Sequence, residues 1–130
     1  MVQRLEHLRI VIVDDHNEVR RTLAGFLSGL GAIVRECANA DDALTELRHL
    51  QPDLVLSDIA MPGKDGFELL REIRSLDRSE GGEVPVVAIT GLTRALDRMR
   101  APAAGFDAIL LKPSPDALLQ VVSEVIQRRM

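Results

Sequence analysis

Short apolar runs alternate along the chain with longer stretches in which apolar residues recur every three or four positions. An unbroken run of Ile, Val and Leu is typical of a strand buried on both faces, and the longer spacing is typical of a helix with one buried face. The predicted strands are Ile10–Val13, Ala32–Glu36, Leu54–Ser57, Pro85–Ile89 and Ala108–Leu111. The predicted helices are Val19–Leu30, Asp42–Leu50, Gly66–Leu76, Arg94–Ala101 and Pro115–Gln127.

Local signals at the ends of the helices support this division. Ser114 followed by Pro115 is typical of an N-cap and a first helical turn, and Asn17 is the simplest N-cap for the first helix. Gly31 suits the left-handed residue that often follows a helix. The polar, glycine-bearing segment Asp77–Glu83 predicts an exposed loop.

The strict alternation of strands and helices predicts βαβ units, and therefore a parallel sheet with helices on both faces. No repeat, linker or low-complexity stretch interrupts the pattern, and a length of 130 residues fits one domain. In open sheets of this kind the ligand site lies beyond the carboxyl ends of the strands. The residues that directly follow each strand are therefore the first candidates for a functional site.

The composition narrows the class of protein. Hydrophobic residues make up 46% of the chain, which argues against disorder. A net charge of −4, the lack of a basic tract and the few aromatic residues argue against direct nucleic-acid binding. The single cysteine, Cys37, excludes an internal disulfide, suits a reducing compartment and is expected to pack in the core. No apolar run approaches the ~20 residues of a membrane span, so we expect a cytoplasmic protein without membrane insertion.

Polar side chains suited to metal and phosphate chemistry follow four of the predicted strands. They are Asp14 and Asp15 after the first strand, Asp58 after the third, Thr90 after the fourth and Lys112 after the fifth. Each would be ordinary alone, because a threonine often ends a strand and a lysine is usually solvated. Three carboxylates at one edge suit Mg²⁺, which offsets the repulsion between the adjacent Asp14 and Asp15. The carboxylates, the metal and Lys112 then balance in formal charge.

The ordered motifs VDD, LVLSDIAMPGKDGFELL, VVAITG and FDAILLKPSP resemble those of the receiver domain of two-component response regulators. The resemblance extends over about residues 8–127, so residues 1–130 are expected to form a single receiver domain. It implies an α/β fold of the flavodoxin-like (βα)5 type, a three-layer sandwich whose five-stranded parallel sheet has the order 2-1-3-4-5. It also implies a signalling domain and not an enzyme in the usual sense.

The resemblance assigns a role to each residue at the strand ends. Asp58 matches the phosphoacceptor, which takes a phosphoryl group from a histidine of a sensor histidine kinase or a histidine phosphotransfer protein. The implied Mg²⁺ ligands are Asp14 (directly or through water), Asp15, Asp58 and the backbone carbonyl of Ala60. Thr90 and Lys112 match the groups that bind the phosphoryl oxygens. A carboxylate nucleophile of this kind needs mainly positioning and neutralisation of charge, and a compact ammonium suits that task.

Neighbouring residues are expected to play lesser parts. His16 follows the acidic pair and is a possible metal ligand, but an exposed loop residue is favoured because Mg²⁺ prefers oxygen ligands. Lys64 lies in the turn after Asp58 and is expected to be solvated, with contact to the kinase as the alternative. Gly66 lets the chain enter the third helix after the turn shaped by Met61–Gly63.

The sequence departs from the family pattern at two positions of one face. Ile109 lies three residues before Lys112, where the family usually has an aromatic residue that moves inward on phosphorylation. Pro102 falls where the family usually continues the fourth helix, so that helix is expected to be short, kinked or ended near Met99. The alternative is that Pro102 lies in the following loop. All residues that the family uses for phosphorylation are therefore present. The two departures affect the face by which the family passes on the signal.

Other functions agree less well with the sequence. A scaffold that is not regulated by phosphorylation would be favoured by the loss of Asp14, Asp58 or Lys112, and all three are present. A Mg²⁺-dependent phosphatase resembling the haloacid dehalogenases needs D-x-D after the first strand, where this chain has adjacent aspartates. A dinucleotide-binding domain needs G-x-G-x-x-G there. We expect a stand-alone receiver or a receiver of a longer protein, such as a hybrid kinase, with an unidentified output partner.

Overall fold

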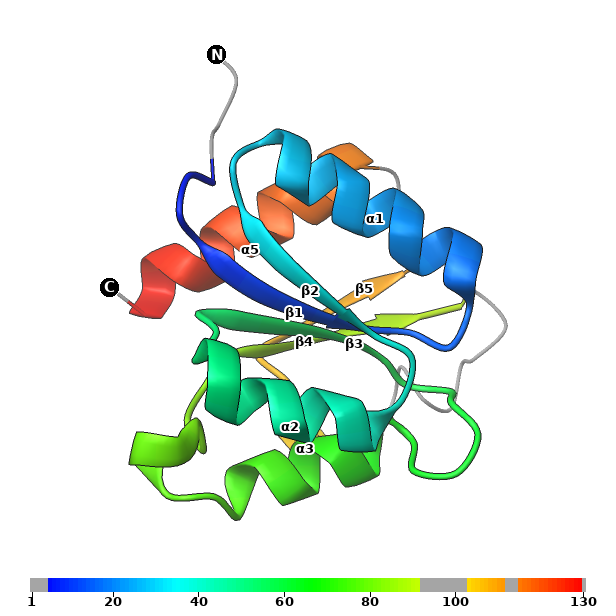
Figure 1. The fold of residues 1–130 in the computed structure, drawn as a ribbon, viewed down its shortest axis with the longest axis vertical. Helices are drawn as coiled ribbons and strands as arrows, with labels where there is room; N and C mark the ends of the chain where they lie inside the picture. The colour runs from blue at the N-terminus through cyan, green and yellow to red at the C-terminus, as the bar shows by residue number, and fades with distance from the viewer. Residues whose placement is uncertain (1–4, 92–102, 112–114, 130) are drawn as a thin grey trace.

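A computed structural model describes residues 5–91, 103–111 and 115–129 of the chain. In this part of the chain five parallel strands form one sheet in the order β2-β1-β3-β4-β5 (Figure 1). The strands are β1 (Arg9–Val13), β2 (Ile33–Cys37), β3 (Leu54–Asp58), β4 (Val86–Thr90) and β5 (Ala108–Leu111). The order and the parallel pairing confirm the predicted flavodoxin-like fold.

Helices cover both faces of the sheet and complete a three-layer sandwich (Figure 1). The helices of the described residues are α1 (Asn17–Gly29), α2 (Ala40–Leu50), α3 (Gly66–Arg74), the short 3-10 helix η1 (Arg78–Glu80) and α5 (Pro115–Arg129). Helices α1 and α5 lie on one face of the sheet, and α2 and α3 lie on the other. None of these helices is both long enough and apolar enough to cross a membrane. The predicted helix Arg94–Ala101, Pro102 and the predicted cap Ser114 lie outside the described residues.

Apolar side chains of β1 alternate between two buried layers. Val11 and Val13 pack in the layer of α2 and α3, whereas Ile10 and Ile12 pack in the layer of α1 and α5. All four side chains are fully buried, which is why the strand has an unbroken apolar run up to Asp14. Burial of each such side chain contributes about 1.5–3 kcal/mol to the hydrophobic stabilisation of the fold.

The start of α1 differs from the prediction. His16 is the N-cap, without a side-chain cap, and Asn17 is the first helical residue. The carboxylate of Asp14 accepts the backbone N–H of His16 at 2.9 Å, so the chain turns before Asn17 and the N-cap lies one residue earlier than expected. The end of the helix agrees with the prediction. Gly31 has a φ of +101°, and a Cβ there would lie 2.8 Å from Cγ of Glu6.

The segment Asp77–Glu83 is exposed over most of its length, as predicted, but it also contains η1. The guanidinium of Arg74 donates to the carbonyls of Gly82, at 3.1 Å, and Val84, at 2.8 Å. The same guanidinium lies 3.3 Å from Oδ2 of Asp107. One arginine at the end of α3 therefore joins this loop to the residue before β5.

Cys37 ends β2 with 3% of its surface exposed, which confirms its expected place in the core. Burial, followed by the nearby carboxylates of Glu46 and Asp42, raises the pKa of the thiol to about 12. The thiol is therefore protonated and shielded at neutral pH. We expect native protein to stay unlabelled by a thiol-specific disulfide reagent during the time in which protein unfolded in urea reacts fully. Equally fast labelling of both forms would contradict this environment.

Candidate functional site

The carboxyl ends of β1, β3 and β4 lie side by side, and a predicted site residue stands at each. Asp14 follows β1, Asp58 ends β3 and Thr90 ends β4. The pairing of Asp58 with Ile89 sets the ends of β3 and β4 at the same level. Exposed fractions of 0% for Asp14, 2% for Asp58 and 1% for Thr90 show that all three residues are buried. Lys112, the predicted cationic partner, lies outside the described residues.

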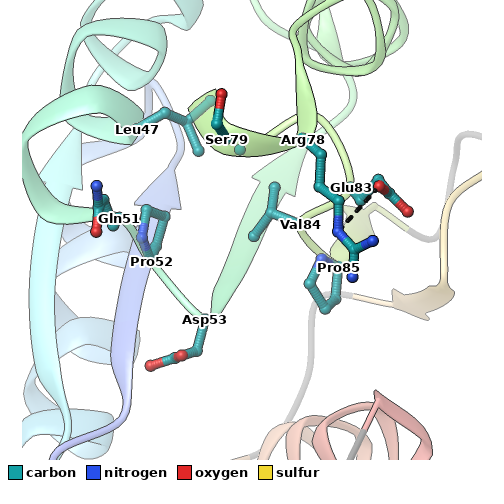
Figure 2. A pocket seen from close by; sticks show the side chains of 10 residues that line it. Leu47, Gln51, Pro52, Asp53, Arg78, Ser79, Glu83, Val84 and Pro85 are labelled. Atoms are coloured by element: carbon teal, nitrogen blue, oxygen red, sulfur yellow. Dashed lines mark ion pairs between the residues drawn. The ribbon is translucent and has the colours of Figure 1, made fainter.

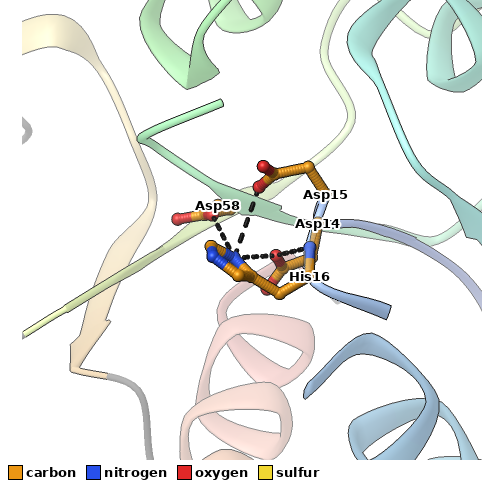
Figure 3. Close-up of side chains that lie close together, drawn as sticks. All are labelled: Asp14, Asp15, His16 and Asp58. Carbon is orange, nitrogen blue, oxygen red and sulfur yellow. Dashed lines mark hydrogen bonds and ion pairs between the residues drawn. The ribbon is translucent and has the colours of Figure 1, made fainter. Parts of the chain in front are cut away.

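Asp14, Asp15 and Asp58 form an acidic cluster, shown in Figure 3. One carboxylate oxygen of each residue and one ring nitrogen of His16 all lie within 4.8 Å of one another. Like charges this close repel, so the cluster favours a bound cation. Asp15 Oδ1 points to the same conclusion, because it is buried and accepts no hydrogen bond from the described residues.

The donor set of the acidic cluster fits Mg²⁺, because this ion prefers oxygen ligands and retains several waters. A cleft of about 490 Å³ beside the cluster provides the room that such waters need. The cleft is lined by Asp15, His16, Ile59, Ala60, Met61, Pro62 and Asp65. A cation at this place would also satisfy the buried oxygen of Asp15.

The turn after β3 holds Asp58 from the backbone side. The N–H of Ala60 donates to Asp58 Oδ1 at 3.4 Å, a long hydrogen bond. Gly66 begins α3 directly against the strand end, and its N–H donates to the carbonyl of Ile59 at 2.8 Å. A Cβ on Gly66 would lie 2.5 Å from the carbonyl oxygen of Asp58. The close approach of α3 to β3 therefore requires glycine, in agreement with the role predicted for it.

Replacing Gly66 with alanine should lower the free energy of unfolding by about 1–3 kcal/mol, because backbone atoms occupy the place of the new methyl group. Gly25→Ala is the matched control. No atom lies within 4 Å of a Cβ at this α1 position, and alanine should raise the free energy of unfolding by up to about 1 kcal/mol. Urea unfolding of both variants measures the difference. The same sign of change in both would contradict the close approach.

His16 is exposed, as expected, but its ring also contacts the acidic cluster. The side chain is 61% exposed, and Nδ1 lies 3.2 Å from Asp14 Oδ1 and 3.4 Å from Asp15 Oδ1. The distance from Nδ1 to Asp58 Oδ2 is 3.9 Å. The imidazole therefore lies beside all three carboxylates of the acidic cluster.

Arg20 is a residue of the site that the sequence reasoning missed. It lies on α1 with 8% of its surface exposed, and its Nη1 donates to the backbone carbonyl of Asp14 at 2.8 Å. Its Nε donates to Glu36 Oε1 on β2 at 3.1 Å. The guanidinium therefore anchors the end of β1, from which two of the acidic residues extend. A basic residue between the apolar Val19 and Leu23 of a helix was the available signal.

The Lys64 side chain is 40% exposed, so it is partly solvated, but it is also ion-paired. Its Nζ lies 2.8 Å from Asp41 Oδ1 and 3.1 Å from Glu72 Oε1. The hydrogen bond to Asp41, and then that to Glu72, raises the pKa of the ammonium above its ordinary value. The lysine therefore connects the turn after β3 with both α2 and α3.

Ile109 lies in β5 beside Ala88 and packs, partly buried, against the core layer of α2 and α3. An aliphatic side chain that branches at Cβ has no ring to move and few rotamers. We therefore predict that phosphorylation changes this face without an aromatic side chain moving inward.

The opposite, amino-terminal edge of the sheet has a groove of about 440 Å³, shown in Figure 2. Its charged groups already have partners. Arg78 Nε lies 3.4 Å from Glu83 Oε2, and Asp53 Oδ2 accepts the backbone N–H of Arg9 at 2.9 Å. The acidic cluster at the carboxyl edge is therefore the better candidate for a functional site.

Comparisons with known proteins identify the family of the chain. The family model described as the response regulator receiver domain matches residues 10–123. An uncharacterized 14.6 kDa protein of Leptolyngbya boryana is 39% identical, over 95% of this chain and 93% of its own length. The sensor histidine kinase RcsC of Salmonella typhi is 37% identical over 95% of this chain, which spans 13% of the kinase.

A solved structure extends the agreement to three dimensions. The chemotaxis protein CheY4 of Vibrio cholerae superposes with a TM-score of 0.82 at 27% identity, covering 92% of this chain and 98% of its own. The family model covers most of the chain, and the sheet order is that of the flavodoxin-like fold. The chain belongs to the response regulator receiver domain family of two-component signalling systems.

Proposed function

We propose that residues 1–130 form one receiver domain that is phosphorylated on Asp58 with the help of Mg²⁺. One observation carries the proposal: the Asp58 carboxylate is buried at the end of the central strand β3, within the acidic cluster. Among the three acids of the cluster, Asp58 is the one that ends a strand with paired neighbours on both sides. This position gives the carboxylate the rigid support that a nucleophile needs.

In this proposal the Asp58 carboxylate attacks the phosphorus atom of a phosphohistidine. The O–P bond forms as the N–P bond breaks, and the imidazole leaves with its electron pair on the donor protein. Bound Mg²⁺ supplies neutralisation of the charge on the phosphoryl oxygens. Asp14, Asp15, Asp58 and the backbone carbonyl of Ala60 would hold the ion, with Asp14 acting directly or through water.

Thr90 and Lys112 are proposed to bind the phosphoryl oxygens. Thr90 is 1% exposed and stands at the end of β4, next to the strand that ends with Asp58. Its Oγ1 lies 3.5 Å from the carbonyl oxygen of Gly91, a contact long enough to be exchanged for a bond to a phosphoryl oxygen. Lys112 would supply a positive charge to the same oxygens.

The phosphoryl donor is proposed to be a sensor histidine kinase or a histidine phosphotransfer protein. Similarity to a part of RcsC supports the kinase, and similarity to a small protein over nearly its whole length supports a stand-alone receiver. The net charge of −4 favours a protein as the output partner over nucleic acid. A single reduced and buried cysteine suits a cytoplasmic location.

Incubation with acetyl phosphate and Mg²⁺, followed by measurement of the intact mass, tests the proposal. We expect one phosphoryl group per chain, no modification in the presence of EDTA, and loss of the group on treatment with hydroxylamine, which cleaves acyl phosphates. An unchanged mass with Mg²⁺ present would contradict the proposed function. A modification that resists hydroxylamine would show a different kind of acceptor.

The phosphorylated state is proposed to be long-lived, since water must be positioned to attack the acyl phosphate and Ala60 at the mouth of the cleft has no polar side chain. Leu92, two residues after Thr90, is the other position from which a polar side chain could hold this water, and it lies outside the described residues. Ala60→Asn should shorten the lifetime several-fold in a mass-based decay assay. Ala103→Asn, at an exposed position of the chain, is the control and should leave the lifetime unchanged. Equal lifetimes in the parent and Ala60→Asn would contradict this control of water.

A further inference from the structure

The imidazole of His16 lies beside the three carboxylates of the acidic cluster. Its Nδ1 is 3.2 Å from an oxygen of Asp14, 3.4 Å from one of Asp15 and 3.9 Å from one of Asp58 (Figure 3). A hydrogen bond to Asp14 accounts for the first of these distances. The convergence of one ring nitrogen and three carboxylates is also the arrangement expected of ligands that share a cation.

The spacing of the four ligand atoms suits a shared cation. With bonds of about 2.1 Å in an octahedral shell, adjacent ligand atoms lie about 3.0 Å apart and opposite ones about 4.2 Å apart. The three distances from Nδ1 to the carboxylate oxygens lie between these two spacings. Because the His16 side chain is 61% exposed, its ring is free to turn toward a cation shared with these carboxylates.

The chemistry of the donor atoms determines which metal ions bind more tightly when His16 is a ligand. Mg²⁺ binds oxygen and gains little from imidazole, whereas Co²⁺, Ni²⁺ and Zn²⁺ bind imidazole well. We propose that His16 Nδ1 is a fourth protein side-chain ligand of the metal at this site. This ligand raises the preference of the site for Co²⁺, Ni²⁺ or Zn²⁺ over Mg²⁺. The inference rests on the proposed metal site of Asp14, Asp15 and Asp58.

The local backbone suits this role. The N–H of His16 is held by the Asp14 carboxylate at 2.9 Å, so Cα of the histidine is positioned at the edge of the cluster whatever its side chain does. With Nδ1 on the metal, Nε2 carries the ring proton. Removal of the imidazole therefore deletes one ligand while leaving the turn that presents the carboxylates in place.

Calorimetric titration of the parent and of His16→Ala with Mg²⁺ and with Co²⁺ tests the inference. We expect His16→Ala to weaken Co²⁺ binding by about tenfold or more, the scale of loss when a support of a metal site is removed. Mg²⁺ binding should change less than about threefold, because Mg²⁺ takes little from an imidazole. His16→Gln, which keeps a polar side chain without the imidazole, should behave as His16→Ala does. His49→Ala, on the last turn of α2, is the matched control and should leave both affinities unchanged.

The ring nitrogens report coordination directly. On addition of Zn²⁺, the ¹⁵N signal of His16 Nδ1 should move to the metal-bound range while those of His7 and His49 stay in place. Equal losses of Co²⁺ and Mg²⁺ affinity in His16→Ala, or an unmoved Nδ1 signal, would overturn the inference and leave the Mg²⁺ site standing. A parent protein that binds neither Mg²⁺ nor Co²⁺ would overturn the inference together with the proposed metal site.

Discussion

Asp58→Asn should abolish the uptake of a phosphoryl group from acetyl phosphate. The amide has nearly the shape of the carboxylate but lacks the nucleophilic oxygen that forms the acyl phosphate. It also removes one negative charge from the cluster of three aspartates, so the fold should persist and should lose a source of repulsion. Intact-mass measurement after incubation with Mg²⁺ and acetyl phosphate is expected to show complete phosphorylation of the parent and none of the variant.

A nearby aspartate provides the matched control. Asp65 lines the same cleft and caps α3 through a hydrogen bond from Glu68 N–H at 2.9 Å. Asparagine caps helices as well as aspartate does, so Asp65→Asn should fold and be phosphorylated like the parent. Phosphate uptake by Asp58→Asn equal to that of the control would show that another residue is the acceptor.

Arg20→Met should lower both the stability of the protein and the rate of its phosphorylation. The substitution keeps an apolar stem but removes the donor to the buried carbonyl of Asp14, a loss of about 1–3 kcal/mol. The ion pair with Glu36 adds little, because that side chain is 38% exposed and the pair is screened by solvent. A looser end of β1 should also misplace Asp14 and Asp15. We therefore expect a larger effect on the rate of phosphorylation by acetyl phosphate than on properties of the protein that do not depend on Mg²⁺.

The adjacent arginine separates this effect from a general loss of charge. Arg21 is exposed on α1, and Arg21→Met should change the free energy of unfolding by less than about 0.5 kcal/mol. Urea unfolding and the rate of mass gain from acetyl phosphate measure both variants. A normal phosphorylation rate in destabilised Arg20→Met would show that the arginine supports the fold without positioning the site. Parent-like stability of that variant would contradict the anchoring of Asp14 itself.

Much of the fold and of the site is readable from local pattern. The apolar run Ile10–Val13 and the helical spacing after it are properties of neighbouring residues, so the strand, the helix and their alternation could be predicted. In the structure the predicted strands differ from the observed ones by a residue or so at their ends. The placement of Asp14, Asp58 and Thr90 at one edge also follows, because parallel strands end at the same side of a sheet.

The caps show where local pattern fails. The position of Asn17 favours an N-cap, but the Asp14 carboxylate holds the backbone of His16 and moves the helix start. The competing hydrogen bond is accepted by the Asp14 side chain, whose direction is set by the end of β1 in the sheet. The N-cap preferences of residue types cannot predict that direction.

Only the tertiary structure decided which side chains from separate elements meet. Arg20 reaches the Asp14 carbonyl and Glu36, and Lys64 joins α2 to α3 through two carboxylates. The His16 ring turns back over the three aspartates. These contacts depend on the rotamers of long or exposed side chains and on the packing of helices against the sheet, neither of which leaves a periodic trace along the chain. The amino-acid sequence therefore determined the sheet and the residues at its carboxyl edge, and the packing of α1, α2 and α3 determined how those residues are held.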